Sequence, residues 1–131
     1  MKSLSKIELS DGEWTIIQAV WEHEPCAAPD IQEALQTTKG WAYSTVRTMM
    51  DRMAAKNLLK TEKVRHMTLY RSAITRPQAQ RSEILQTLKK AFNGALTPMV
   101  QCMLDTQDLS ARELGELENL IQQRRKRAEN K

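Results

Sequence analysis

The side chains best suited to chemistry are hydroxyls, guanidinium groups and one carboxylate gathered on one short stretch. They are Ser44, Thr45, Arg47, Thr48, Asp51 and Arg52. Between them, Val46, Met49, Met50 and Met53 recur at three- and four-residue steps, which predicts an amphipathic helix within residues 40–59. Short hydroxyls beside a guanidinium can approach a phosphate and still reach a base edge in the major groove of DNA. The alternative is an ordinary surface helix of a globular protein.

The sequence changes period directly after this helix. Residues 60–64 and 67–71 are β-prone and flank the pair Arg65-His66, which predicts a short hairpin. The hairpin side chains that could contact DNA are Lys60, Lys63, Arg65 and His66. A helix that leads into a basic hairpin is typical of a winged helix-turn-helix, in which the helix enters the groove and the hairpin rests on adjacent phosphates.

Two helices should precede the groove-binding helix. Ser10 and Glu13 have the spacing of a capping box, and Leu9 is placed to pack against Trp14. The first helix should bury Trp14, Ile17, Val20 and Trp21. Pro25 and Pro29 then interrupt the chain, and a short second helix is expected at about residues 30–37, with Ile31, Ala34 and Leu35 facing inward. Residues 38–40, which end in a glycine, supply the turn of a helix-turn-helix.

Three further helices should follow the hairpin, beginning near Thr75, Thr97 and Ser110, with residues 105–108 as a polar connector. Each carries a single apolar stripe and has too little mass to bury it alone, so we expect a second copy of the chain to cover the stripes. The residues predicted for this two-fold interface are Met99, Val100, Met103, Leu114, Leu117, Leu120 and Ile121. The alternative is that these helices pack back onto the winged helix. The basic end, residues 124–127, is expected to be frayed and solvated.

Charge is concentrated where DNA binding is predicted. The net charge of +4 conceals twelve Lys or Arg and three acids in residues 39–90, against two Lys and seven acids in residues 1–38. A focused positive charge is typical of proteins that bind nucleic acid, although a solvated basic face would look the same. No apolar run could span a bilayer and the N-terminus lacks a signal-peptide core, so we expect a cytoplasmic protein without a membrane partner.

Few residues in the sequence could form a catalytic site or a metal site. Cys26 and Cys102 lie far apart, and His23 and His66 are the other soft ligands, so neither a metal site nor a cofactor is predicted. Both thiols are expected to be reduced and buried. No Ser/His/Asp, Cys/His or paired-carboxylate arrangement is present, so we expect no catalytic residues. A helical protein-protein adaptor remains the alternative to a DNA-binding regulator.

These inferences combine into one architecture. We predict a mainly α protein with a winged helix-turn-helix DNA-binding domain at residues 1–75 and a helical dimerisation segment with a basic tail at residues 76–131. The predicted function is that of a homodimeric regulator that binds double-stranded DNA.

From Leu9 to about Gln123, the sequence resembles the penicillinase-repressor family of dimeric winged-helix regulators of β-lactamase and methicillin-resistance genes. The motifs that carry the resemblance are Leu9-Ser10…Glu13-Trp14…Val20-Trp21, Trp41 to Thr48 with Arg52-Met53, Phe92-Asn93-Gly94, and Asp108-Leu109-Ser110…Glu113-Leu114…Leu117. The resemblance implies operator contacts at Ser44, Thr45, Arg47 and Thr48, and dimerisation through the C-terminal helices. It further implies the function of a homodimeric transcriptional repressor, which binds a palindromic double-stranded operator and is released by an inducing signal.

The sequence departs from that family in two places. The copper-responsive branch carries paired Cys-x-Cys motifs near the C-terminus, and this chain has none. The β-lactam branch is inactivated by proteolysis at an Asn-Phe bond, and the aligned bond here joins Cys102 to Met103. The resemblance therefore implies a sensor-linked protease as a partner and Cys102-Met103 as the candidate cleavage site, while the changed residues leave induction by another ligand open.

Overall fold

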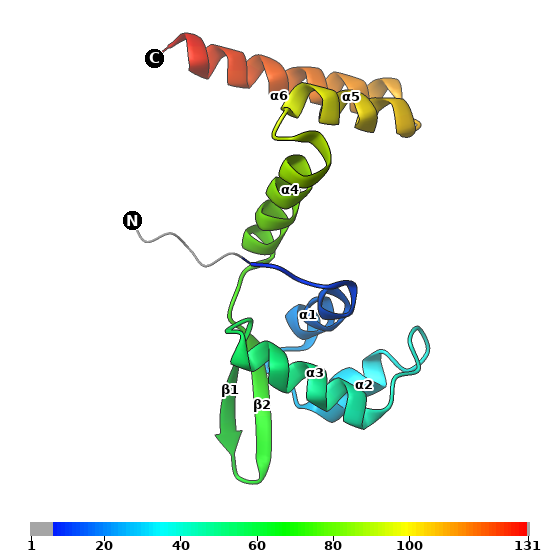
Figure 1. The fold of residues 1–131 in the computed structure, drawn as a ribbon, viewed down its shortest axis with the longest axis vertical. Helices are drawn as coiled ribbons and strands as arrows, with labels where there is room; N and C mark the ends of the chain where they lie inside the picture. Colours follow the sequence, from blue (N-terminus) through cyan, green and yellow to red (C-terminus); the bar gives the residue numbers. More distant parts are fainter. Residues whose placement is uncertain (1–6, 131) are drawn as a thin grey trace. The chain divides into compact units, whose positions relative to one another are not determined.

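The computed structural model describes residues 7–130 (Figure 1). Within them, the order is α1 (Asp11–His23), α2 (Ala28–Ala34), α3 (Tyr43–Ala55), β1 (Leu59–Val64), β2 (Met67–Ser72), α4 (Arg76–Phe92), α5 (Leu96–Thr106) and α6 (Ala111–Glu129). The predicted mainly α class is confirmed. The chain divides into two compact units between Gln86 and Thr87, inside α4. None of the helices described is long and apolar enough to cross a membrane.

The predicted capping box of α1 is confirmed. The Ser10 hydroxyl accepts a hydrogen bond from the Glu13 amide at 3.2 Å, and the Glu13 carboxylate accepts one from the Ser10 amide at 2.9 Å. The carboxylate also accepts a 2.6 Å hydrogen bond from the Lys56 ammonium at the end of α3. Burial opposes ionisation of Glu13, but Lys56 and Ser10 outweigh it and hold its pKa below the ordinary value. This side chain therefore fixes the start of α1 to the end of α3.

The second helix begins earlier than predicted and is shorter. It spans Ala28–Ala34, with Pro29 in its first turn, where a missing N–H costs no helical hydrogen bond. The expected range of 30–37 was wrong because it treated Pro29 as a barrier. Ile31 and Leu35 are buried as expected, but Ala34 is exposed. The turn that follows ends at Gly40, whose φ of 62° favours glycine.

The core of the first unit lies between α1, α2, α3 and the hairpin. Its fully buried side chains include Ile16, Ile17, Val20, Ile31, Val46, Met50, Met53 and Tyr70. The hairpin prediction is confirmed: β1 and β2 are antiparallel, Val64 pairs with Met67, and Arg65-His66 form the turn. Cys26 adds a short bridge to the free side of β2, since its backbone exchanges two hydrogen bonds with Tyr70. The hairpin is thus anchored to the loop between α1 and α2.

The first unit extends beyond residue 75 because the start of α4 packs on α1 and the segment before it. Thr75 and Gln78 form the predicted capping box, and Ala79 is buried. The Trp14 indole donates a hydrogen bond to Glu83 at 3.2 Å, and the Ser82 hydroxyl donates one to the Ile7 carbonyl at 2.6 Å. The structural division therefore differs from the boundary predicted at residues 75–76.

The second unit shows two departures from the predicted helix ends. Helix α5 continues to Thr106, so residues 105 and 106 belong to the helix and the connector is shorter than expected. Helix α6 continues to Glu129, so residues 124–127 are helical rather than frayed. Arg, Lys and Ala are good helix formers, and cations near a helix C-terminus offset its dipole, which explains the extension. Ser110 caps α6 by accepting a hydrogen bond from the Glu113 amide at 3.1 Å.

Candidate nucleic-acid interface

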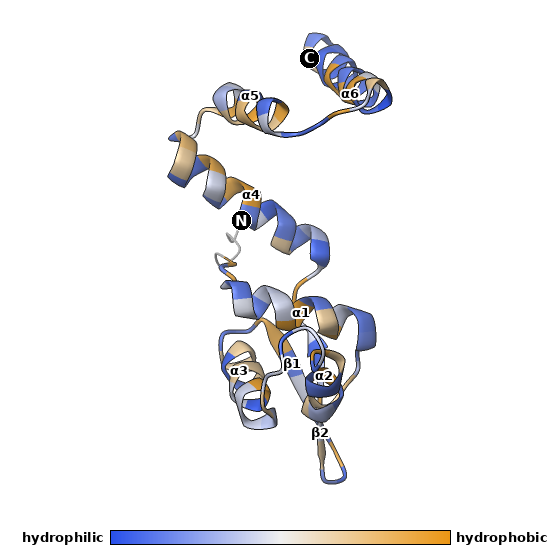
Figure 2. Cartoon of the chain, turned by 90° about the vertical axis from the view of Figure 1, so that its right-hand side faces the viewer, coloured by the Kyte–Doolittle hydropathy of each residue, from blue (hydrophilic) through white to orange (hydrophobic). Residues whose placement is uncertain are grey.

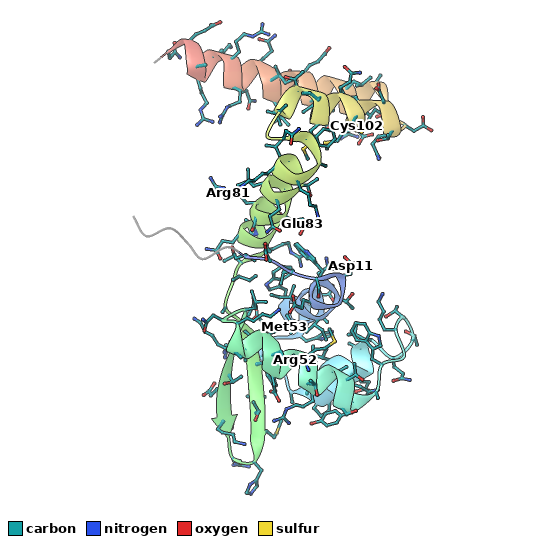
Figure 3. All side chains as sticks on the ribbon, viewed as in Figure 1. Asp11, Arg52, Met53, Arg81, Glu83 and Cys102 are labelled. Atoms are coloured by element: carbon teal, nitrogen blue, oxygen red, sulfur yellow. The ribbon has the colours of Figure 1, made fainter. Side chains whose placement is uncertain are left out.

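The outer face of α3 presents the predicted recognition side chains together. Ser44, Thr45, Thr48, Asp51 and Arg52 are exposed, and Arg47 is half-buried. The neighbouring residue of Arg52, Met53, is fully buried, so the helix separates a core face from a polar face as its sequence period requires (Figure 3). The structure thus brings the hydroxyls and the two guanidinium groups onto one exposed surface.

Arg47 is held in place on this surface by two neighbours on its own helix. Its Nε donates a hydrogen bond to the Asp51 carboxylate at 3.1 Å, and its Nη1 donates one to the Tyr43 hydroxyl at 3.3 Å. The hydrogen bond with Tyr43 and the nearby charge of Asp51 raise the pKa of Arg47 above its ordinary value. Both partners lie four residues from Arg47, where side chains on a helix meet.

Asp51, which the sequence prediction placed among the DNA-contacting residues, makes two hydrogen bonds within the protein. One of its carboxylate oxygens accepts from Arg47, and the other accepts a 2.7 Å hydrogen bond from the hydroxyl of Tyr70. A free carboxylate would repel phosphate, but this one is engaged by a cation and a phenol. The geometry therefore makes Asp51 a support for Arg47, whereas the sequence prediction placed it among the DNA-contacting residues.

Tyr70 links the hairpin to α3 from inside the core. Its side chain is fully buried, and only its hydroxyl reaches the polar face. Burial, followed by the hydrogen bond to Asp51, raises the pKa of Tyr70 to about 12. The phenol therefore remains a neutral hydrogen-bond donor at physiological pH.

Sequence reasoning missed both tyrosines of this network. Tyr43 is exposed and begins α3, and its spacing of four residues from Arg47 was readable in the sequence. Tyr70 could be recognised only as an inward-facing strand residue, because its contact with Asp51 joins residues far apart in the chain.

The hairpin carries its cations on both of its faces. Lys60, Lys63, Arg65 and His66 are all exposed. Lys63 pairs with Thr68 and therefore lies on the same face as Tyr70, toward α3, because alternate strand residues share a face. Lys60 pairs with Arg71 on the opposite face. The register therefore distinguishes two lysines that the sequence prediction treated alike.

Helices α5 and α6 of the second unit carry exposed hydrophobic side chains, and Figure 2 colours the hydrophobic residues of both helices orange. Six of the seven residues predicted for the dimer interface are exposed: Val100, Met103, Leu114, Leu117, Leu120 and Ile121. Met99 is the exception, because it is already buried within the single chain. Leu96 and Leu104 are also exposed and were not among the predicted residues. An isolated chain would thus leave apolar side chains of both helices in water, which makes them candidates for a protein interaction surface.

The candidate cleavage site lies inside α5. Cys102 and Met103 are both exposed, so the expectation of two buried thiols was wrong for Cys102 (Figure 3). Cys26 is buried, and this burial, followed by the negative charges of Asp30 and Glu24, raises the pKa of its thiol to about 11. In residues 7–130, no group of three or more His, Cys, Asp or Glu side chains is arranged to hold a metal ion.

Comparisons with known proteins identify relatives of this chain. A family profile described as "Penicillinase repressor" matches residues 9–123. The methicillin resistance regulatory protein MecI of Staphylococcus aureus (strain N315) is 25% identical over 114 residues, which cover 87% of this chain and 93% of that protein. The penicillinase repressor of Bacillus licheniformis is 25% identical over 120 residues, which cover 92% of this chain and 94% of that protein.

A solved structure supports the fold of the first unit. The solution structure of the DNA binding domain of the repressor BlaI aligns with a TM-score of 0.50 and 24% identity, covering 55% of this chain and 88% of that domain. The predicted winged-helix fold is confirmed by this similarity.

Proposed function

The chain belongs to the penicillinase repressor family, and from this membership we propose that it is a DNA-binding transcriptional repressor that reads its operator with α3. The observation that carries the proposal is the exposed polar face of α3, where Arg47 is oriented by Asp51 and Tyr43 beside the hydroxyls of Ser44 and Thr48. A guanidinium with a fixed orientation can donate two hydrogen bonds to a guanine edge.

The start of α3 suits a phosphate. Ala42 precedes the helix and has no side-chain acceptor for the N–H groups of the first turn. Unpaired amides at a helix N-terminus bind anions, and the exposed hydroxyls of Ser44 and Thr45 lie beside them. We expect a backbone phosphate here, which would position Arg47 over the bases.

The hairpin would add contacts with the neighbouring backbone. Lys63 lies on the α3 side of the hairpin, and Arg65 lies at its tip. Both should contact phosphates next to the groove that α3 enters. His66 also lies at the hairpin tip, and Arg52 lies on the outer face of α3. Each of these two side chains can add a contact with the backbone phosphates. We place this activity in the cytoplasm, where a bacterial operator would be accessible.

We further propose that two copies of the chain join through the apolar surface of α5 and α6. A two-fold dimer would present two copies of α3 to the halves of a palindromic operator. Once one DNA-binding unit of a dimer is bound, the linked second unit is present at high effective concentration near the other half-site. The dimer would therefore bind the operator far more tightly than a single unit.

Proteolysis within the dimer surface would reverse this gain, because it would separate α6 and the end of α5 from the DNA-binding unit. The Cys102-Met103 bond, inside α5, is our candidate. Both residues are exposed, although α5 is helical there and the Cys102 carbonyl accepts a hydrogen bond from Thr106 at 2.9 Å. A protease would therefore have to unwind the end of α5. Mass spectrometry of the protein recovered from induced cells should find a fragment ending at Cys102, and an intact chain during derepression would rule out the site.

A gel-shift series tests the proposed function. The probes are the DNA upstream of the protein's own gene and a scrambled duplex of equal length and composition, each titrated at several salt concentrations. A repressor should prefer the upstream DNA, and binding to both should weaken as salt rises. The competing function, a helical protein-protein adaptor, predicts no salt-dependent binding to either duplex.

A further inference from the structure

The C-terminal end of α6 carries a cationic patch that the proposed function does not use. Its members are Arg124, Arg125, Lys126 and Arg127, which we call the α6 cationic patch. All four side chains are exposed, and within the described part of the chain none of them has a salt bridge. The family profile ends at Gln123, so family membership assigns no role to the patch.

Compensation of the helix dipole explains only part of the patch. Cations in the last turn of a helix offset the partial negative charge of its C-terminus. Lys126 and Arg127 occupy the last turn of α6, but Arg124 and Arg125 lie before it. The effect falls off within that turn, so the first two arginines add charge without serving the dipole.

The arrangement around the helix favours a partner with many negative charges. With 3.6 residues per turn, four consecutive side chains point to most sides of the helix. A partner helix packs against one face only, and it would leave the cations on the other sides without a partner. A duplex instead offers a phosphate for about every 1.7 Å of its axis, and its two backbones border each groove. A helix end that lies along a groove therefore has phosphates on two sides, within reach of long flexible cations that point in different directions.

We propose that the α6 cationic patch is a second contact with duplex DNA, made to the phosphate backbone without regard to sequence. The proposal rests on the proposed function, since the operator brings duplex DNA to the protein. Guanidinium groups bind phosphate oxygens through paired, charge-assisted hydrogen bonds. Such contacts add affinity but carry no base information.

The test compares the full chain with a neutralised variant, R124Q/R125Q/K126Q/R127Q, on a random-sequence duplex. Glutamine has a helix propensity close to that of Arg and Lys, so α6 should stay helical, which circular dichroism verifies. The matched control is R124K/R125K/R127K, which keeps every charge. Each phosphate contact that is lost makes the slope of log affinity against log salt shallower by about 0.9.

The slope for the neutralised variant should be shallower by about 0.9 or more, the amount expected for at least one lost phosphate contact. This variant should also bind random and upstream DNA more weakly by the same factor. The lysine control should keep the slope of the wild type. An unchanged slope for the neutralised variant would overturn the proposal.

A second copy of α6 is the competing partner, because Glu113, Glu116 and Glu118 make the first half of the helix acidic. Sedimentation of the same variants identifies that case: a neutralised variant that dissociates while the lysine control does not would overturn the DNA contact. Failure of the proposed function would look different. It would appear as a wild-type chain with no preference for upstream DNA, whereas the patch is judged by the salt slope of the neutralised variant on random duplex.

Discussion

The hydroxyl of Tyr70, in the core of the winged helix, donates a 2.7 Å hydrogen bond to Asp51 on the exposed face of α3. Asp51 in turn accepts from Arg47, so a buried strand residue controls how a guanidinium is presented to solvent. Two elements that would contact DNA separately, α3 and the hairpin, are therefore coupled through one carboxylate.

Replacing Tyr70 by Phe removes this hydrogen bond and keeps the buried ring. We expect unfolding by urea to show a loss of about 1 kcal/mol, since Asp51 is exposed and water can replace the phenol. Arg47 should become less ordered, so preference for the operator should fall while affinity for random duplex is kept. Tyr43→Phe is the control for stability. Because Tyr43 is exposed, removing its hydroxyl should leave the free energy of unfolding unchanged. Equal stability of Tyr70→Phe and the wild type would show that the hydrogen bond contributes nothing.

The same phenol predicts how stability depends on alkaline pH. Its pKa is raised from about 10 in an unfolded chain to about 12 in the folded protein, so the folded state holds the proton more tightly. The stabilisation from Tyr70 should be complete below pH 10 and should disappear as the pH rises through about 12. Cys26, whose pKa is raised in the same direction, is present in both proteins and cancels in the comparison. The difference in unfolding free energy between the wild type and Tyr70→Phe should therefore be constant up to pH 10 and fall above it. A difference that stays constant would contradict the raised pKa.

The hairpin should contribute affinity without sequence preference. Neutralising Lys60, Lys63 and Arg65 together should weaken binding to operator and random duplex by similar factors. Lys63→Gln alone should cost more than Lys60→Gln, because Lys63 shares the α3 face of the hairpin and Lys60 lies on the other face. A loss confined to the operator would show that the hairpin reads bases, and equal losses for the two lysines would show that the faces do not matter.

The apolar surface of α5 and α6 should hold two copies together. Leu117→Asp would place an unpaired charge in the proposed interface, a change that typically costs several kcal/mol. The variant should sediment as a monomer and lose cooperative occupancy of two half-sites. Asn119→Asp adds the same charge at an exposed polar position of α6 and should leave the dimer intact. Wild-type protein that sediments as a monomer at micromolar concentration would remove the basis for this surface.

Local sequence signals predicted much of the fold. The Ser10 capping box, the α3 period and the Arg65-His66 turn depend on residues within a few positions of one another, and the structure confirms each. The start of α2 was missed because a proline can serve a first helical turn as well as end a helix. The tail of α6 was missed because its charge was taken as a sign of disorder, although its residues favour helix.

The details of the candidate site depended on long-range packing. The spacing of hydroxyls and arginines on α3 was enough to predict its exposed face. The role of Asp51 was not predictable, because it depends on Tyr70, a residue nineteen positions away in the chain. The Tyr70 hydroxyl reaches Asp51 only once the sheet packs on α3. The position of Met99 was likewise unpredictable, since an apolar stripe does not show which of its members a single chain already buries.

Selection from a pool of randomised duplexes tests the central claim most directly, namely that Arg47 on α3 reads DNA sequence. The wild type should enrich one palindromic sequence and prefer it to a scrambled version. Arg47→Ala should fold normally and lose about 1–3 kcal/mol on the enriched sequence, with relaxed preference at one base pair of each half-site. A wild-type chain that enriches no sequence, or an Arg47→Ala chain with unchanged affinity, preference and salt slope, would contradict the account.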